Sequence, residues 1–375
     1  MLLMALDHVR DFVGPSQPPE MMDDPGLPLF LTRWVTHFCA PIFVLLAGVS
    51  AYLYGAKRTR PALTQFLVTR GAWLIFLELT IIAFAWTFVV PFTSYMFLQV
   101  IFVIGAAMIG LAGLIWLPRG ALVALTAAAI LAHDALAATT YEQGIRSAEL
   151  LSLHGLDALW TVIHAPFVPI EVFGVIWFPI YALLPWVFVL ALGYLLGPVF
   201  TRPAPERARA CLRLGLGVVA AFLIVRGLSI YGDPRPFAAS GSAEATFIAF
   251  LNTTKYPPSL QFLLMTIGPA LVFLGLADRA NGRIARVLTV FGSVPLFYYV
   301  LHIALSNAVG GAYFHYRHGI DRWIGAILNF QPPDLPVDLL AVYAAWAGVV
   351  LTLYPLCRWY AGVKRRGDGW WWSYL

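Results

Sequence analysis

Residues 30–55 read FLTRWVTHFCAPIFVLLAGVSAYLYG, an apolar stretch that is interrupted only by Arg33 and His37 near its start. A helix that crosses a bilayer needs about 20 largely apolar residues, so the stretch predicts a transmembrane helix over 29–54. Arg33 and His37 are four residues apart and share one helix face. Pro41 has no N–H, so the carbonyl of His37 loses its usual helical partner. We therefore expect a polar notch in this helix.

The composition extends this interpretation to the whole chain. Hydrophobic residues make up 60% of the sequence and charged residues 11%, whereas a soluble domain averages about 25% charged residues. The mean hydropathy is +0.78. Further spans are expected at 71–91, 95–117, 120–138, 174–199, 214–231, 257–277, 287–311 and 337–357. With a truncated first segment, they predict an all-α polytopic transmembrane bundle of about ten helices, forming one domain over residues 1–375.

The basic residues predict the orientation. Most lysines and arginines, among them Arg60, Arg70 and Arg209, fall in loops on one side of the predicted membrane. The positive-inside rule makes that side cytoplasmic. No basic stretch interleaved with aromatic residues points to nucleic acid. The three cysteines have no ligand spacing, so we expect neither a metal site nor a disulfide framework.

Residues 7–11, DHVRD, follow an apolar start that is too short to span a bilayer. We infer that the upstream half of this first helix is missing. Asp7, Arg10 and Asp11 share one helix face. A charge inside a bilayer costs at least about 2.5–3.5 kcal/mol on insertion scales, so such residues are kept mainly for function. The motif faces the predicted extracytoplasmic side.

Two interpretations of these charges remain open. In the structural one, Arg10, Arg33 and Arg226 pair with Asp7, Asp11 and Glu78 and hold the helices together. In the functional one, a neutral His37 acts as a base, because its unperturbed pKa of about 6.5 suits that task. Asp7 or Asp11 would then orient the imidazole. We favour the structural interpretation for Glu78 and Arg226, and the functional one for the residues of the first two helices.

Other polar residues carry weaker signals. His302 lies at mid-membrane depth and is a second catalytic or ligand-binding candidate, while Gln99 and Asn307 suit hydrogen bonds between helices. Lys255 precedes the helix start Pro257-Pro258 and could bind an anion or a substrate hydroxyl. Six residues are expected at outer helix ends or in outer loops, in contact with solvent: His133, Asp134, His154, His164, His315 and His318.

Several motifs together resemble one known family. They are MALDHVRDFVG (4–14), FLTRWVTHFCAPIFVLLAGVSAYLYG (30–55), RGAWLIFLELT (70–80), IYGDP (230–234), NTTKYPPSLQFLLMTIGPA (252–270) and FGSVPLFYYVLH (291–302). This set resembles the bacterial branch of the heparan-alpha-glucosaminide N-acetyltransferase-like membrane proteins, over nearly the whole chain. The resemblance implies transmembrane acyl transfer, in which eukaryotic members deliver acetyl from cytosolic acetyl-CoA to a glucosamine amine on the other side.

The resemblance also implies where the active site lies. In that family the site comprises the first two helices and the loop between them, with a histidine, an asparagine and an aspartate. Aligning the motifs places the asparagine at Asp7, the aspartate at His37 and the loop histidine near Leu27. Because Leu27 is not a histidine, either His8 or His37 takes its role, or this branch catalyses a different reaction.

We therefore expect a membrane acyltransferase. The predicted catalytic residues are His37, His8, Asp7 and Asp11, with one of the histidines as general base or acyl carrier and Arg33 or Arg10 stabilising the oxyanion. The predicted substrate-binding residues are Arg10, Arg33, Arg226, His302, Lys255 and Gln99. Arg60, Arg70 and Arg209 are expected to hold the phosphates of coenzyme A.

The expected surroundings follow from the same features. They are a lipid bilayer, most simply the bacterial cytoplasmic membrane, a small-molecule acceptor such as a glycan, and no nucleic acid. A homodimer is one possible assembly. The alternatives are a transporter of a small polar solute, which solute flux without an acyl donor would reveal, and a non-catalytic scaffold, which would tolerate substitution of Asp7, Arg33 and His37.

Overall fold

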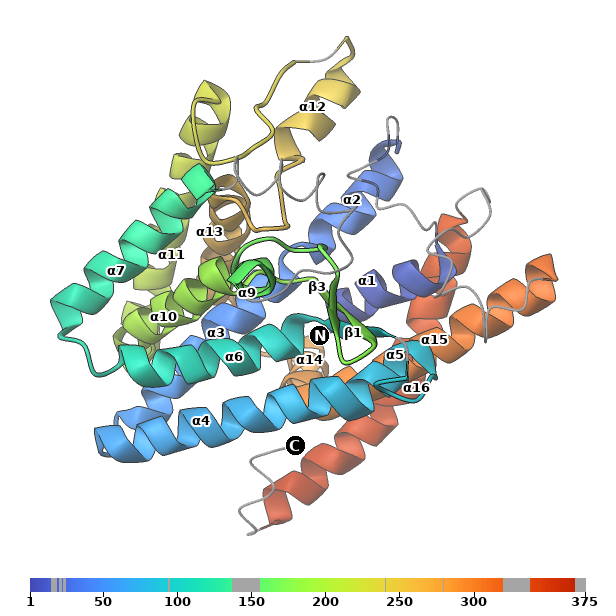
Figure 1. The fold of residues 1–375 in the computed structure, drawn as a ribbon, viewed down its shortest axis with the longest axis horizontal. Helices are drawn as coiled ribbons and strands as arrows, with labels where there is room; N and C mark the ends of the chain where they lie inside the picture. Colours follow the sequence, from blue (N-terminus) through green and yellow to red (C-terminus); the bar gives the residue numbers. More distant parts are fainter. Residues whose placement is uncertain are drawn as a thin grey trace. The chain divides into compact units, whose positions relative to one another are not determined.

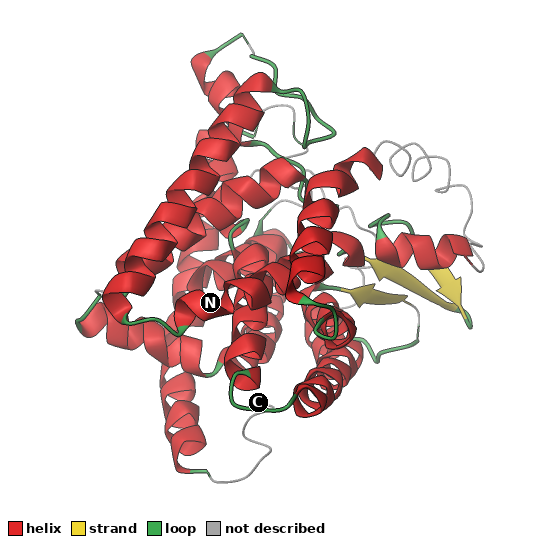
Figure 2. Cartoon of the chain, turned by 90° about the vertical axis from the view of Figure 1, so that its left-hand side faces the viewer, coloured by secondary structure: helices red, strands yellow, loops and turns green. Residues whose placement is uncertain are grey.

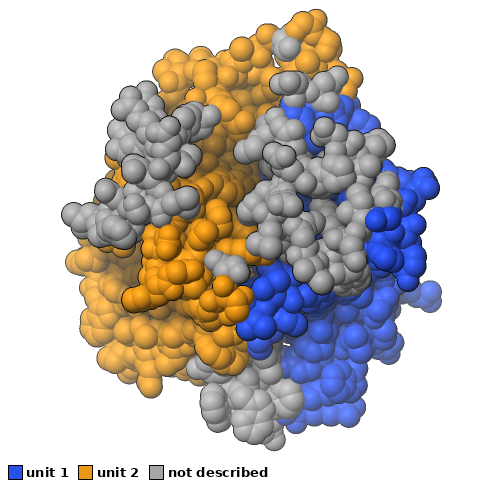
Figure 3. Space-filling view, turned by 45° about the vertical axis from the view of Figure 1, so that its right-hand side comes forward, with its two compact units in different colours: residues 1–39, 81–90, 280–375 blue, residues 40–80, 91–279 orange. Residues whose placement is uncertain are grey.

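The computed structural model describes residues 1–14, 19, 22, 25–93, 95–136, 156–239, 241–278, 280–319 and 338–367. The chain divides into two compact units, coloured separately in Figure 3. Unit 1 comprises Met1–Cys39, Ile81–Val90 and Ala280–Leu375, and unit 2 comprises Ala40–Thr80 and Pro91–Arg279. Unit 1 therefore gathers segments that are far apart in the sequence, whereas only Ile81–Val90 separates the two segments of unit 2.

Unit 1 is helical. Its helices are α1 (Leu2–Val13), α2 (Leu27–Thr36), α5 (Ala83–Thr87), α14 (Arg283–Ser293), α15 (Pro295–His318) and α16 (Leu339–Arg366). Helix α1 lies beside α15 and α16 (Figure 1). The Trp346 indole on α16 donates to the Leu2 carbonyl at 3.0 Å. Gly310 of α15 lies so close to Phe12 that an added Cβ would meet the Phe12 carbonyl oxygen at 2.6 Å.

Unit 2 contains most of the remaining helices. They are α3 (Cys39–Gly55), α4 (Arg60–Leu77), α6 (Val100–Leu114), α7 (Arg119–Ala132), η3 (His133–Leu136), α9 (Leu156–Ile163), α10 (Leu183–Phe200), α11 (Ala204–Leu228), α12 (Ala243–Leu251) and α13 (Leu260–Ala277). A π-helical turn, η2 (Glu78–Ile82), follows α4. Helices α3 and α10 touch through Gly48 and Gly193, where an added Cβ would collide with the backbone of the other helix. Small residues allow such close contact in membrane bundles.

A three-stranded sheet in unit 2 was not expected (Figure 2). Its strands are β1 (Tyr95–Leu98), β2 (Ile170–Val172) and β3 (Val175–Pro179), in the order β1-β3-β2. Strand β3 runs parallel to β1 and antiparallel to β2. The prediction of one helix over 174–199 is therefore wrong in its first part, and α10 begins only at Leu183. The β-branched and aromatic residues of Val175–Phe178 suit a strand once a partner is present.

The helices confirm the all-α polytopic fold. In the described residues, seven helices are long and apolar enough to cross a membrane, and the pair α14 and α15, bent by 87°, can be counted as an eighth. Helix α6 is apolar but shorter. The chain is therefore an integral membrane protein. The predicted helix over 29–54 is one candidate span from Leu27 to Gly55, but it is interrupted between Thr36 and Cys39, close to the carbonyl of His37 that Pro41 leaves without its helical partner.

Candidate functional site

The Asp7 carboxylate joins the first two helices of unit 1. Its Oδ1 atom accepts hydrogen bonds from Arg33 Nη1 and from Thr36 Oγ1 at 2.8 Å, both on α2. Arg10 Nη2, one turn further along α1, lies 3.4 Å from the same oxygen and 2.5 Å from Asp11 Oδ1. Asp7, Arg10 and Arg33 are all buried. The ion pairing of both arginines is thus confirmed. The pairs of Arg10 lie within α1, and the pair of Arg33 with Asp7 attaches α1 to α2.

His8 makes a different contact, with His302 of α15. The His302 Nδ1 atom lies 2.9 Å from the Tyr298 carbonyl oxygen, which can only accept, so Nδ1 carries a proton. In a neutral ring Nε2 must then accept, and the His8 Nδ1–H, at 2.7 Å, donates to it. This chain of hydrogen bonds leaves the lone pair of His8 on Nε2. His302 is fully buried, whereas His8 is half-buried.

Aromatic rings surround this histidine pair. The two imidazoles stack with centroids 4.9 Å apart, and the rings of Trp86 and Tyr299 meet His8 edge-on at 5.0 and 6.0 Å. Asn307 holds α5 in place by donating to the carbonyls of Ala85 and Trp86, at 3.2 and 2.9 Å. Within the described residues, the buried indole N–H of Trp86 has no hydrogen-bond partner. A donor without a partner thus belongs to a ring that contacts the His8 imidazole.

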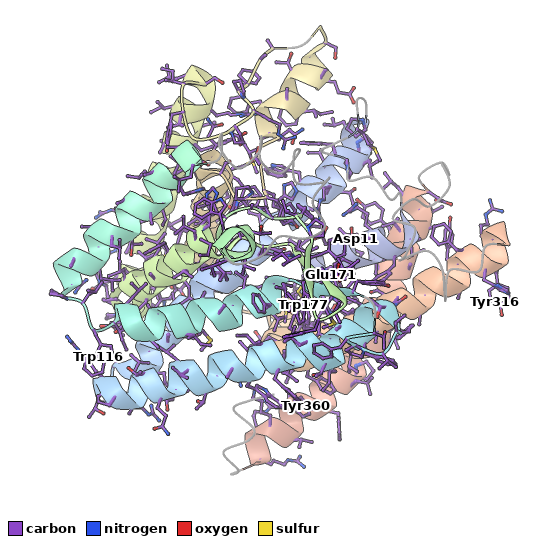
Figure 4. The ribbon with its side chains drawn as sticks, in the orientation of Figure 1. Asp11, Trp116, Glu171, Trp177, Tyr316 and Tyr360 are labelled. Carbon is purple, nitrogen blue, oxygen red and sulfur yellow. The ribbon has the colours of Figure 1, made fainter. Side chains whose placement is uncertain are left out.

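The sequence pattern did not indicate Trp86 or Thr36 as site residues. Trp86 looks like an ordinary apolar residue of a span, and no local spacing connects it to His8. Thr36 precedes His37 and could have been noticed as a polar neighbour on the same helix. His37 itself lies in the break between α2 and α3 with 2% of its surface exposed. Asp11 and Tyr316, both labelled in Figure 4, mark α1 and the end of α15.

Glu78 and Arg226, which were expected to balance each other, have separate structural roles in unit 2. Glu78 is buried and accepts the Phe102 backbone N–H at 3.3 Å, in the first turn of α6. An acidic side chain at a helix N-terminus compensates unpaired N–H groups and the helix dipole. Gln99 is the residue just before that helix.

Arg226 anchors the segment that follows α11. All five guanidinium N–H groups are engaged, because they donate to the carbonyls of Phe250, Arg235, Ala249 and Asn252 and to Gln261 Oε1. The distances run from 2.7 Å for Ala249 to 3.1 Å for Arg235. A guanidinium that is saturated in this way acts first as a structural clamp.

Two outer histidines are not solvated. His133 and His164 are 1% and 0% exposed, and their ring centroids lie 6.1 Å apart, so that prediction is wrong for both. The tertiary cause is the contact of His133 with His164, which are far apart in the chain, while Trp160, one helical turn before His164, stacks on its ring at 5.3 Å. Burial lowers the pKa of His164. Asp134 is also buried, whereas His315 is exposed as expected. His154 and the His318 side chain lie outside the described residues.

One comparison with known proteins is decisive. Residues 20–232 match the family model described as heparan-alpha-glucosaminide N-acetyltransferase, catalytic, and this is more than half of the chain. The chain belongs to the heparan-alpha-glucosaminide N-acetyltransferase family. No curated protein and no solved structure matches it.

Membership of the heparan-alpha-glucosaminide N-acetyltransferase family indicates membrane acetyltransferase activity. The matched residues include Arg33, His37 and Arg226, but the match starts after His8 and ends before His302. The assignment of these last two residues to a site thus depends on geometry. In the part of the chain that the structure describes, no group of three or more histidine, cysteine, aspartate or glutamate side chains could hold a metal ion.

The arginines predicted to hold coenzyme A lie on two helices of unit 2. Arg60 begins α4 and is exposed, and Arg70 lies further along the same helix, half-buried. Arg209 is exposed on α11, and its Nε donates to the Pro205 carbonyl at 3.2 Å. Their exposure leaves Arg60 and Arg209 accessible to a soluble phosphate-bearing molecule.

Proposed function

We propose that this protein transfers acetyl from cytosolic acetyl-CoA to an amine or hydroxyl group of an extracytoplasmic acceptor, such as an amino sugar, and that His8 is the general base. The bacterial cytoplasmic membrane is its proposed location. The single observation that carries the assignment is the hydrogen-bonded chain from the Tyr298 carbonyl through His302 to His8. A base whose other nitrogen is held by a buried partner has a defined tautomer and orientation.

His8 suits this role better than His37 for two reasons. Its Nε2 lone pair follows from the contacts of His302, and its half-buried ring is more accessible to an acceptor than His37, at 2% exposure. In the proposed step the acceptor nitrogen or oxygen attacks the thioester carbonyl carbon while His8 Nε2 takes its proton. The carbon–sulfur bond then breaks, and the leaving thiolate of coenzyme A receives that proton.

The negative charge that develops on the thioester oxygen needs a hydrogen-bond donor. Arg10 and Arg33 already donate to carboxylates, so we assign them to positioning α1 and α2. The buried N–H of Trp86, next to His8, is the proposed oxyanion donor. Loss of one such donor lowers kcat by about 10²–10³-fold. We expect Trp86→Phe, which keeps a ring but removes the N–H, to lower kcat in this way with little change in Tm.

The remaining predicted residues complete the proposal. Arg60, Arg70 and Arg209 would bind the phosphates of coenzyme A, because guanidinium groups form strong hydrogen bonds with phosphate. Gln99 and Arg226 stay proposed substrate contacts, although their present contacts are structural ones.

The test uses purified protein, radiolabelled acetyl-CoA and glucosamine-type acceptors. We expect labelled product from the unaltered protein, and a loss of about 10²–10⁴-fold in kcat for His8→Ala, as for the removal of a general base. His315→Ala is the matched control, because this histidine is exposed at the end of α15 and should leave turnover unchanged. Full activity of His8→Ala together with loss in His37→Ala would reassign the base. Solute uptake into proteoliposomes without acetyl transfer would favour a transporter.

A further inference from the structure

The Lys255 side chain is largely buried in the segment between α12 and α13, while its Nζ atom is not among the fully buried polar atoms. The exposed fraction of the residue is only 5%, although the segment belongs to no helix or strand. Within the described residues, its ammonium group has no hydrogen bond and no ion pair, and its one specific contact is with the ring of Tyr256, whose centroid lies 5.0 Å from Nζ. Burying an unpaired charge is costly, so a ligand or partner of opposite charge normally compensates it.

Two carboxylates lie close to this segment, and in the described residues neither forms an ion pair with Lys255, although Asp134 Oδ1 has no hydrogen-bond partner. Asp233 Oδ2 accepts from the Thr254 N–H and from Ser259 Oγ, both at 2.7 Å, and its Oδ1 accepts from Thr254 Oγ1 at 2.9 Å. Asp134 Oδ2 accepts the Leu260 N–H at 2.8 Å. The sequence thus supplies two acids beside Lys255, but the fold uses them to hold the backbone at the start of α13.

Aromatic rings lie on one side of Lys255. The Tyr256 ring meets Phe167 at 5.0 Å and Tyr181 at 5.4 Å, in both cases edge-on. Such a cluster lowers the local polarity, which strengthens the attraction between an ammonium and an anion. It offers no acceptor that could neutralise a cation beyond the weak attraction of a ring face.

We propose that Lys255 forms an anion-binding site with Tyr256, and that its ligand carries a phosphate or carboxylate group. The two sources of such a group are a soluble anion and the headgroup of an anionic lipid. The site belongs to unit 2 and shares no residue with the proposed base, the proposed oxyanion donor or the proposed coenzyme A contacts, so either proposal can fail without the other.

The test measures the Tm of the full-length protein in detergent at constant ionic strength. A ligand that binds only the folded state raises Tm. We expect inorganic phosphate, or phosphatidic acid added to the micelles, to raise the Tm of the unaltered protein by about 2 °C or more, whereas phosphatidylcholine does not. The rise should vanish in Lys255→Gln, persist in Lys255→Arg, and persist in Lys57→Gln, whose lysine is exposed in the same unit.

Each outcome decides the proposal. A Lys255-dependent rise with inorganic phosphate identifies a soluble anion, and one with phosphatidic acid alone identifies a lipid headgroup. No rise with either probe, or equal rises in Lys255→Gln and the unaltered protein, refutes the site. If Lys255→Gln does not fold, Lys255→Met replaces it, because methionine keeps an unbranched apolar stem in the same buried place without the charge. A rise in Tm that persists in Lys255→Met refutes the proposal.

Discussion

Asp7 and His8 are consecutive residues with different partners. The α-helix has 3.6 residues per turn, so neighbouring side chains point about 100° apart. Asp7 accordingly reaches Arg33 and Thr36 on α2, while His8 reaches His302 on α15. The motif DHVRD therefore does two things in one helical turn. It fastens α1 to another helix through charge, and it presents an oriented imidazole.

Replacing Asp7 by asparagine should strongly destabilise the protein. The change keeps the shape of the side chain but leaves Arg33 buried without its counter-charge, and breaking a buried ion pair costs about 3–5 kcal/mol. A large drop in Tm during thermal unfolding in detergent is the expected result. Asp278→Asn is the control, since its pair with Arg207 is partly exposed, at 19% and 27%, and surface pairs contribute about 0–1 kcal/mol. Equal Tm shifts for the two variants would contradict this prediction.

For single residues, the sequence predicted which ionisable side chains are unusual better than it predicted the partners of those side chains. The ionisable residues of α1 and α2 stand out because charges are rare in apolar segments. The pairing of His8 with His302 could not be predicted, since 294 residues separate them. The burial of His133 and His164 was missed for the same reason, because these two rings pack together although they are far apart in the chain.

Helices α3 and α10 depend on the absence of side chains at their contact. A Cβ on Gly48 would overlap the Leu190 backbone, and one on Gly193 would overlap the Leu45 backbone. The close-contact motif Gly193-xxx-Gly197 was recognisable in the sequence, and the structure places Tyr52 of α3 against Gly197. The identity of the partner helix, however, followed only from the fold.

Alanine at Gly48 should therefore separate these two helices. The added methyl group cannot be accommodated by a flexible side chain, because the obstacle is backbone, and overpacking costs about 1–3 kcal/mol or more. Gly113→Ala is the matched control, since nothing lies within 4 Å of its Cβ position. Alanine there should stabilise α6 by about 0.5–1 kcal/mol. The Tm in detergent should fall for Gly48→Ala and rise for Gly113→Ala. A Gly48→Ala protein as stable as the unaltered one would contradict the close packing.

Strand β3 shows how tertiary pairing overrides a local pattern. Residues 174–199 read as one apolar segment, and nothing in their hydropathy separates the first residues from the rest. The structure pairs Trp177 with Met96 of β1 and with Ile170 of β2. Because strand formation depends on partners elsewhere in the chain, β propensity alone could not reveal it.

The orientation of the whole molecule in the membrane remains a prediction from its charges. Basic loops on one side make that side cytoplasmic by the positive-inside rule. Lys57, which follows α3, should then face the cytoplasm, and Tyr316 near the end of α15 the opposite side. Both positions are exposed, and Tyr316 has 86% of its surface accessible. That residues 1–375 form one domain also stays a prediction, since the described residues divide into two compact units.

Cysteine labelling of intact cells would test this orientation. The native residues Cys39, Cys211 and Cys357 are first replaced by alanine, and a single cysteine is then introduced as Lys57→Cys or Tyr316→Cys. A membrane-impermeant maleimide should label Tyr316→Cys in intact cells and Lys57→Cys only after permeabilisation. The reverse pattern would invert the topology and place the His8 side of the protein in the cytoplasm.

The sequence by itself determined that the protein lies in a membrane, where most of its helical spans run, and which ionisable residues are exceptional. These properties are local, because the hydropathy of a segment and the free energy of placing a charge in a bilayer depend on a residue and its near neighbours. Only the tertiary structure decided that Asp7 pairs with Arg33 of α2 and that His8 hydrogen-bonds to His302. It also decided that the Lys255 side chain is largely buried without an ion pair in the described residues. Contacts between distant segments arise from packing, and no periodicity along the chain encodes them.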